Sequence, residues 1–180
     1  MAVNETSYLI LGHLTQDFTP EGVQMGGTVA YSGLTASALG CAVRMVTVYP
    51  QQPNLPVNGK LAIHCYHTSK ATQFENSVED GKRTQYCYSQ AENILPECIP
   101  NQWMRSDIIH LGPVAQEIPL ETIQIFFGHP FLCATPQGWM RKWDENGKVY
   151  PVRWDWADEV LPHLHAVVIR QVLFQTVQGH

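Results

Sequence analysis

The 180-residue sequence has few charged residues and lacks long apolar runs. Asp, Glu, Lys and Arg make up 15% of the chain, and the formal net charge is −5 at pH 7. Because phosphate binding needs clustered cations and the 11 Lys and Arg residues are scattered, we expect no nucleic acid as a partner. No apolar segment approaches the ~20 residues that cross a bilayer, and no basic segment followed by an apolar one opens the chain. We therefore expect no membrane contact and a cytoplasmic location.

Cysteine pairs and metal-ligand clusters are also lacking. The cysteines are odd in number and widely spaced, at Cys41, Cys65, Cys87, Cys98 and Cys133. This usage favours reduced thiols over a disulfide framework or a zinc site. The histidines have no carboxylate or thiolate at metal-ligand spacing, so we predict no metal site. His110 is expected in or beside a core strand, with a hydrogen-bond partner.

Two nucleotide-binding motifs are absent. No Gly-x-Gly-x-x-Gly follows the first apolar segment, which argues against a dinucleotide-binding domain. The chain also has no Gly-x4-Gly-Lys-[Ser/Thr] sequence, which excludes a standard P-loop.

The most informative feature present is a glycine pair, Gly26-Gly27, at the start of a helix of small residues that ends near Gly40. Glycines at a helix entry let a ligand approach the backbone, and the free N–H groups of the first turn can donate to its oxygens. We place Asp17 in the loop before this helix, as an acceptor for hydroxyl groups. The pattern predicts a pocket for a polyhydroxylated small molecule. The alternatives are tight packing for the glycines and a solvated loop carboxylate for Asp17.

Strand and helix patterns alternate along most of the chain. Short apolar runs predict buried strands, and apolar stripes at helical spacing predict helices between them. The expected strands are 8–11, 43–49, 108–111, 131–134 and 166–169, with helices at 26–40, 120–127 and 156–164. This alternation is typical of an α/β protein with a mostly parallel sheet covered by helices.

Two hairpins interrupt this alternation. Segments 71–78 and 84–89 are sparsely apolar, and Asp80-Gly81 between them predicts a turn, so we expect a partly exposed antiparallel flap. Asn146-Gly147 predicts a second hairpin. Four tryptophans lie close together in this part of the sequence, and either a sugar platform or packing against the sheet accounts for them: Trp139, Trp143, Trp154 and Trp156.

These motifs occur in an order that is similar to a known family. From about Tyr8 to Ile169, the chain resembles the N-terminal part of the ribokinase-like (PfkB) carbohydrate kinases. The residues that carry this resemblance are Gly12, Asp17, Gly26-Gly27, Ala30, Leu39-Gly40, Thr72-Gln73-Phe74-Glu75-Asn76, Asp80-Gly81-Lys82-Arg83, His110-Leu111-Gly112-Pro113 and Thr135-Pro136-Gln137-Gly138-Trp139.

The resemblance implies an incomplete ribokinase-like fold. We expect residues 1–169 to form a truncated kinase domain with a mostly parallel central sheet flanked by helices. A small antiparallel β lid is expected at about 62–90, and it implies a homodimer joined through the lid. Residues 170–180 are expected to be a non-homologous tail.

The resemblance also implies roles for individual residues. Asp17 would accept hydrogen bonds from substrate hydroxyls, and Gly26 and Gly27 would line the substrate through their backbone. Tyr31 stands where the family often has Asn. Phe74 and Asn76 of the lid would contact the substrate, with a plain hairpin bearing one apolar face as the alternative.

The chain departs from the family in its C-terminal part. The family carries a Gly-Ala-Gly-Asp motif, whose aspartate is the general base and whose backbone forms an anion hole, and this sequence contains none. The complete enzymes use ATP and Mg²⁺, and we expect this chain to bind neither and to supply no catalytic residue. We therefore expect a PfkB-type sugar or nucleoside kinase truncated before its catalytic and ATP-binding half, inactive alone. The alternative is a sugar-binding or regulatory remnant without catalysis.

Overall fold

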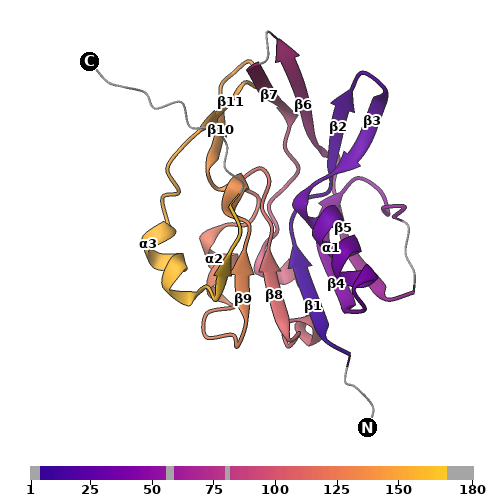
Figure 1. The fold of residues 1–180 in the computed structure, drawn as a ribbon, viewed down its shortest axis with the longest axis vertical. Helices are drawn as coiled ribbons and strands as arrows, with labels where there is room; N and C mark the ends of the chain where they lie inside the picture. The colour runs from indigo at the N-terminus through magenta and orange to yellow at the C-terminus, as the bar shows by residue number, and fades with distance from the viewer. Residues whose placement is uncertain (1–4, 56–58, 80–81, 170–180) are drawn as a thin grey trace.

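The computed structural model describes residues 5–55, 59–79 and 82–169. Its centre is a six-stranded parallel sheet with the strand order β12-β9-β8-β1-β4-β5 (Figure 1). The chain runs from β1 outward to β5 and then returns to β8, on the other side of β1. Ligands of open parallel sheets bind beyond the carboxyl ends of the strands at such a switch point. The strands are β1 (Ser7–Leu11), β4 (Ala42–Tyr49), β5 (Leu61–His67), β8 (Ile108–Leu111), β9 (Leu132–Ala134) and β12 (Ala166–Val167).

Helices cover both faces of this sheet, which explains why its inner strands are apolar runs rather than alternating patterns. The helix α1 (Thr28–Ala38) packs on Ile10 and Met45 on one face. On the opposite face, α2 (Leu120–Gln124) and α3 (Ala157–Val160) pack on Leu9 and Leu111 and their neighbours. Short 3₁₀ turns lie at Pro96–Cys98, Asn101–Trp103, Pro136–Gly138 and Leu161–His163.

A second sheet projects from the carboxyl ends of the central strands and forms the lid, with the order β3-β2-β6-β7 (Figure 1). Its pairs β2–β3 and β6–β7 are antiparallel, as predicted for the lid, whereas β2 and β6 are parallel neighbours. The strands are β2 (Thr15–Thr19), β3 (Gly22–Gly26), β6 (Thr72–Glu79) and β7 (Lys82–Ser89).

The second predicted hairpin consists of β10 (Arg141–Trp143) and β11 (Val149–Pro151). Its turn lies against the lid, because the N–H of Cys87 donates to the carbonyl of Gly147 over 2.7 Å. The hairpin therefore connects the lid to the segment that leads into α3.

Most of the predicted elements are confirmed, and three expectations need correction. The segment 61–67 was expected to begin the lid, but it is β5 of the central sheet, paired with β4. Asp17, expected in a loop before the helix, lies instead in β2, which pairs with β3 in the lid. The last strand, β12, was expected to be buried but lies at the edge of the sheet. Val168 and Ile169, which follow it in the sequence, are 62% and 59% exposed. The predicted turn at Asp80-Gly81 and the tail 170–180 lie outside the described residues.

None of the helices in the described ranges has the length and apolar character needed to cross a bilayer.

Candidate functional site

Asp17 lies on the lid strand β2 and not in a loop. The segment Thr15–Thr19 pairs with Gly22–Gly26, and Gly22, the first residue after the turn, has φ +120°. Asp17 has Gln24 of β3 as one neighbour and Phe74 of β6 as the other. These strands are polar and short, so their sequence carries little apolar periodicity and suggests a loop.

The carboxylate of Asp17 lies against the glycine pair. A Cβ atom on Gly26 would overlap Oδ2 of Asp17 and would lie 2.7 Å from Oγ1 of Thr15. The hydroxyl of Thr15 donates to Oδ1 of Asp17 over 2.8 Å, which fixes the orientation of the carboxylate. The structure thus brings Asp17 and Gly26 together.

Gly27 sets the direction in which α1 leaves the lid. Its φ is +99°, and a Cβ at this position would overlap the carbonyl oxygen of His13. No side chain caps the first turn of α1. The N-terminal N–H groups of the helix and its positive dipole end therefore face the same region as the glycine pair.

Phe74 and Asn76 share one face of the lid with Asp17, because alternate residues of a strand point to the same side. We call this side the inner face of the lid, defined by Asp17, Phe74 and Asn76. Phe74 is only 3% exposed and packs on Val114. It therefore attaches the lid to the central domain. The side-chain oxygen of Asn76 accepts a hydrogen bond of 3.0 Å from Gln85.

The side chain of Tyr31 lines a different surface from Asp17, Phe74 and Asn76. It is 64% exposed, on the stripe of α1 that also carries Thr35 and Leu39. It lines a mainly apolar groove of about 450 Å³ together with Tyr8, and no residue of the inner face of the lid lines this groove. The backbone N–H of Tyr31 donates to the carbonyl of Gly27 over 3.4 Å, one helical turn from the glycine pair, whereas its side chain lines this groove.

A buried polar network supports the base of the lid, and sequence reasoning missed it. The imidazole of His13 bonds to the hydroxyl of Thr72 over 2.7 Å and to the carbonyl of Glu92 over 2.8 Å. Burial lowers the pKa of His13. The partners lie 59 and 79 positions from His13, so no local sequence pattern predicts these hydrogen bonds.

Glu117 is fully buried beside this network. Its carboxylate accepts hydrogen bonds from the backbone N–H groups of His13, at 2.9 Å, and of Ala115, at 2.7 Å. It thereby ties the segment after β1 to the loop after β8. This is the switch point of the sheet, and the carboxylate stabilises its backbone rather than facing a ligand.

His110 has the buried position and the hydrogen-bond partners predicted for it. It is 7% exposed on β8, its Nε2 lies 2.8 Å from the hydroxyl of Thr135, and its Nδ1 bonds to the hydroxyl of Tyr8. Burial lowers the pKa of His110 to about 4 and raises that of Tyr8. Both groups are therefore neutral at pH 7.

The five cysteines are free thiols. Within residues 5–55, 59–79 and 82–169, no three His, Cys, Asp or Glu side chains are grouped so that they could hold a metal ion.

Comparison with models of protein families gives no match, and no curated protein matches the sequence. Solved structures do match. A sulfate complex of a pyrophosphate-dependent kinase in the ribokinase family has TM-score 0.73 at 20% identity, covering 89% of this chain and 60% of that chain. Such a kinase complexed with a pyrophosphate analog and myo-inositol gives TM-score 0.72 at 20% identity, covering 90% of this chain and 60% of that one.

A more distant match is an uncharacterized sugar kinase from Pyrococcus horikoshii, with TM-score 0.53 at 12% identity, covering 71% of this chain and 54% of that chain. The chain spans about 60% of the length of the first two structures. Over the residues that the structure describes, the chain has the ribokinase-like fold that its sequence predicted.

Proposed function

We propose that this chain is the acceptor-binding part of a PfkB-type kinase and binds a sugar, nucleoside or related polyol beside Asp17. The observation that carries the proposal is the contact between the Asp17 carboxylate and Gly26. A carboxylate can accept hydrogen bonds from two neighbouring hydroxyl groups, and hydrogen bonds to a charged acceptor are strong. Because Gly26 has no side chain, a ring can approach the backbone beside the carboxylate.

The surrounding elements support the same interpretation. The start of α1 presents backbone donors next to the glycine pair, and Asn76 adds an amide on the same face of the lid. The site also lies beyond the carboxyl ends of the central strands, where parallel sheets bind ligands.

We propose that phosphoryl transfer needs groups that this chain does not contain. Transfer depends on a positioned base and on stabilisation of charge at the moving group, and the sequence has no Gly-Ala-Gly-Asp motif. ATP with Mg²⁺ is the donor implied by the resemblance. Two of the similar structures are named as pyrophosphate-dependent kinases, so both donors belong in the test.

Calorimetric titration with D-ribose, D-glucose, adenosine and myo-inositol tests acceptor binding. We expect Asp17→Asn to weaken binding about 10- to 100-fold, the loss of a hydrogen bond to a charged group. Glu75→Gln is the matched control, because Glu75 lies on the opposite face of the same lid and accepts a hydrogen bond from Tyr88. Binding that is unchanged in Asp17→Asn, or absent for all four compounds, contradicts the proposal.

Activity is tested separately. With ATP we measure ADP release, and with pyrophosphate we measure the phosphate formed together with the phosphorylated acceptor. We expect no turnover from the chain alone, and turnover that persists after removal of contaminating kinases contradicts this part. If no downstream reading frame encodes Gly-Ala-Gly-Asp, a sugar-binding or regulatory protein without catalysis replaces the kinase proposal.

A further inference from the structure

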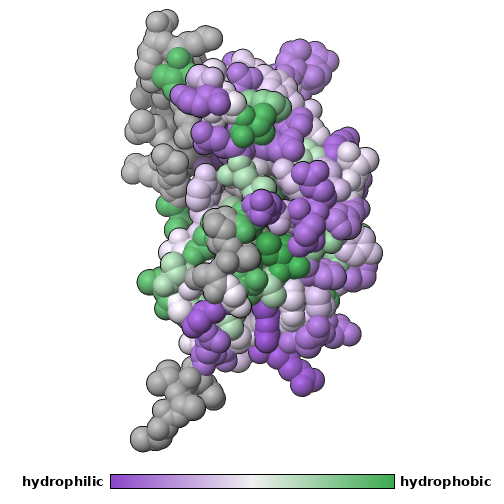
Figure 2. Space-filling view, turned by 90° about the vertical axis from the view of Figure 1, so that its right-hand side faces the viewer, coloured by the Kyte–Doolittle hydropathy of each residue, from purple (hydrophilic) through white to green (hydrophobic). Residues whose placement is uncertain are grey.

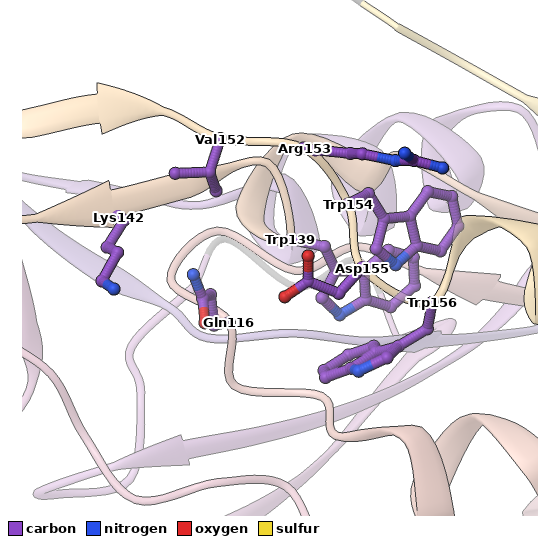
Figure 3. A pocket seen from close by; sticks show the side chains of 8 residues that line it. All are labelled: Gln116, Trp139, Lys142, Val152, Arg153, Trp154, Asp155 and Trp156. Carbon is purple, nitrogen blue, oxygen red and sulfur yellow. The ribbon is translucent and has the colours of Figure 1, made fainter.

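A cavity of about 300 Å³ lies between the β10–β11 hairpin and the segment before α3 (Figure 3). It shares no residue with the site around Asp17. Four parts of the chain build it: the loop after β8, the turn after β9, the strand β10 and the segment that follows β11. The lining residues used below are Gln116, Trp139, Lys142, Trp154, Asp155 and Trp156.

Two stacked indoles form the floor of the cavity. The rings of Trp139 and Trp154 lie 4.7 Å apart with an interplanar angle of 18°, and both side chains are almost completely buried. The Nε1–H of Trp139 donates to the carbonyl of Ile118 over 2.8 Å. This hydrogen bond is the usual way in which a buried indole satisfies its N–H.

The second indole lacks such a partner. Nε1 of Trp154 is buried and has no hydrogen-bond acceptor among the described residues, although the residue is only 6% exposed. A buried donor that is left unpaired destabilises the folded state, and an acceptor supplied by a ligand removes this cost. Figure 3 shows this nitrogen on the side of the ring that faces Asp155 and Trp156. Because this nitrogen is buried, a ligand oxygen can bond to it only after side chains beside it shift.

Hydrogen-bond donors and hydrogen-bond acceptors both lie around the two indoles. The amide nitrogen of Gln116 donates to the carbonyl of Arg141, which leaves its side-chain oxygen as an acceptor. The carboxylate of Asp155 lies between Gln116 and the indoles in Figure 3. The ammonium group of Lys142 adds a donor at the end of the cavity away from the indoles. The cavity thus offers two acceptors, one ammonium donor and one unpaired indole N–H.

We propose that this cavity binds a neutral hydroxylated ring, such as a sugar or cyclic polyol, independently of the site at Asp17. Hydroxyl groups both donate and accept, which matches the mixture of groups, and the C–H faces of the ring pack on indole. The Asp155 carboxylate near the middle of the cavity disfavours an anion. Arg153, the other cation of this cavity, lies 3.4 Å from Asp158.

The full chain carrying Asp17→Asn isolates this cavity from the proposed acceptor site. After labelling with ¹⁵N-tryptophan, its five tryptophans give five indole signals, and Trp154→Phe assigns that of Trp154. We expect D-glucose or myo-inositol to move the Trp154 signal downfield, because its N–H gains an acceptor. The signal of Trp103, which contacts His64, should not move. Failure of every neutral ring to move the Trp154 signal overturns the proposal.

Affinity in the same Asp17→Asn background provides the second readout. Trp154→Phe keeps an aromatic ring and removes the N–H donor. We expect it to weaken the binding of D-glucose and myo-inositol about fivefold. Asp155→Asn, at an exposed position, should weaken it similarly and tests the cavity even if Trp154→Phe fails to fold. Glu121→Gln, at an exposed position that does not line the cavity, is the matched control and should bind normally. Unchanged affinity in Asp155→Asn, or tighter binding of adenosine 5′-monophosphate than of D-glucose, overturns the proposal.

Discussion

At Gly27 the chain turns from the lid into α1 with a backbone conformation that side chains rarely tolerate. Its φ of +99° coincides with close packing on the carbonyl of His13, so both the conformation and the space require glycine. Gly22 has φ +120°, but nothing lies within 4 Å of the point that a Cβ would occupy there. Comparing substitutions at Gly22 and Gly27 therefore distinguishes the cost of the strained backbone from the cost of steric overlap.

We predict that Gly22→Ala lowers the free energy of unfolding by about 1–3 kcal/mol, the cost of the strained backbone. Gly27→Ala should cost about 1–3 kcal/mol more, since its Cβ also overlaps a backbone oxygen. Urea unfolding of both variants measures the difference. Equal decreases in the free energy of unfolding would show that the backbone at His13 shifts to accommodate the new Cβ without cost.

His110 makes the stability of the protein depend on pH. Its folded-state pKa of about 4 lies below the ordinary value of 6.5, so the unfolded chain binds the proton more readily. The contribution of neutral His110 is fully present above pH 6.5 and is lost as the pH falls toward 4. The full loss is about 3 kcal/mol, at 1.36 kcal/mol per pKa unit.

We expect urea midpoints to fall between pH 6.5 and 4 and to fall less steeply in His110→Gln. Some dependence should remain, because burial also lowers the pKa of His13. An equally steep pH dependence in the variant would rule out this role for His110.

At the scale of elements, one buried hydroxyl joins three segments at the base of the lid. Oγ1 of Thr72 accepts a hydrogen bond from the N–H of Ala91 at 3.0 Å and bonds to His13. One side chain thus joins the start of β6, the segment after β7 and the segment before β2. We expect it to hold the lid at a fixed angle to the central sheet.

Thr72→Val keeps the shape of the side chain and leaves both partners unpaired. We predict a loss of about 2–4 kcal/mol, with one buried polar group unsatisfied at each partner. Amide hydrogen exchange should also rise across β6 and β7. Thr84→Val, at a half-buried position on β7, is the control and should change stability by less than about 0.5 kcal/mol. Unchanged lid exchange in Thr72→Val would contradict the proposed attachment.

The lid contains strands that the sequence predicts and strands that it does not. The β6–β7 hairpin is visible in the sequence because β-branched and aromatic residues flank a turn signal. The strands β2 and β3 are not, because Thr15–Thr19 has Phe18 as its only large apolar residue. The strand β2 pairs with β3, its neighbour in sequence, and with β6, whose matching residues lie 57 positions away.

For the whole molecule, apolar side chains are exposed near both edges of the central sheet. On the side that carries β5, Figure 2 shows apolar areas among hydrophilic side chains, and Tyr66 of β5 is 49% exposed. At the opposite edge, β12 is followed by the exposed Val168 and Ile169. An edge strand with exposed apolar residues is a template for association.

We predict concentration-dependent association of the wild-type chain through the β12 edge. Sedimentation velocity should show Val168→Lys with Ile169→Lys shifted toward the monomer. Val23→Lys is the comparison, because Val23 is 58% exposed on β3 at an edge of the lid. If Val23→Lys alone gives monomers, the dimer expected through the lid replaces the β12 contact.

The sequence by itself determined most of the local elements and the α/β class, since apolar runs, helical stripes, glycines and turn signals act over a few neighbouring residues. Its resemblance to a known family implied the ribokinase-like fold. The sequence also pointed to Asp17 and the glycine pair. Only the tertiary structure decided that Asp17 lies on a strand against Gly26, that Tyr31 faces a separate groove, and that β5 belongs to the central sheet. These facts depend on pairings between distant segments, because strand partners and buried hydrogen bonds are chosen by the packing of the whole chain.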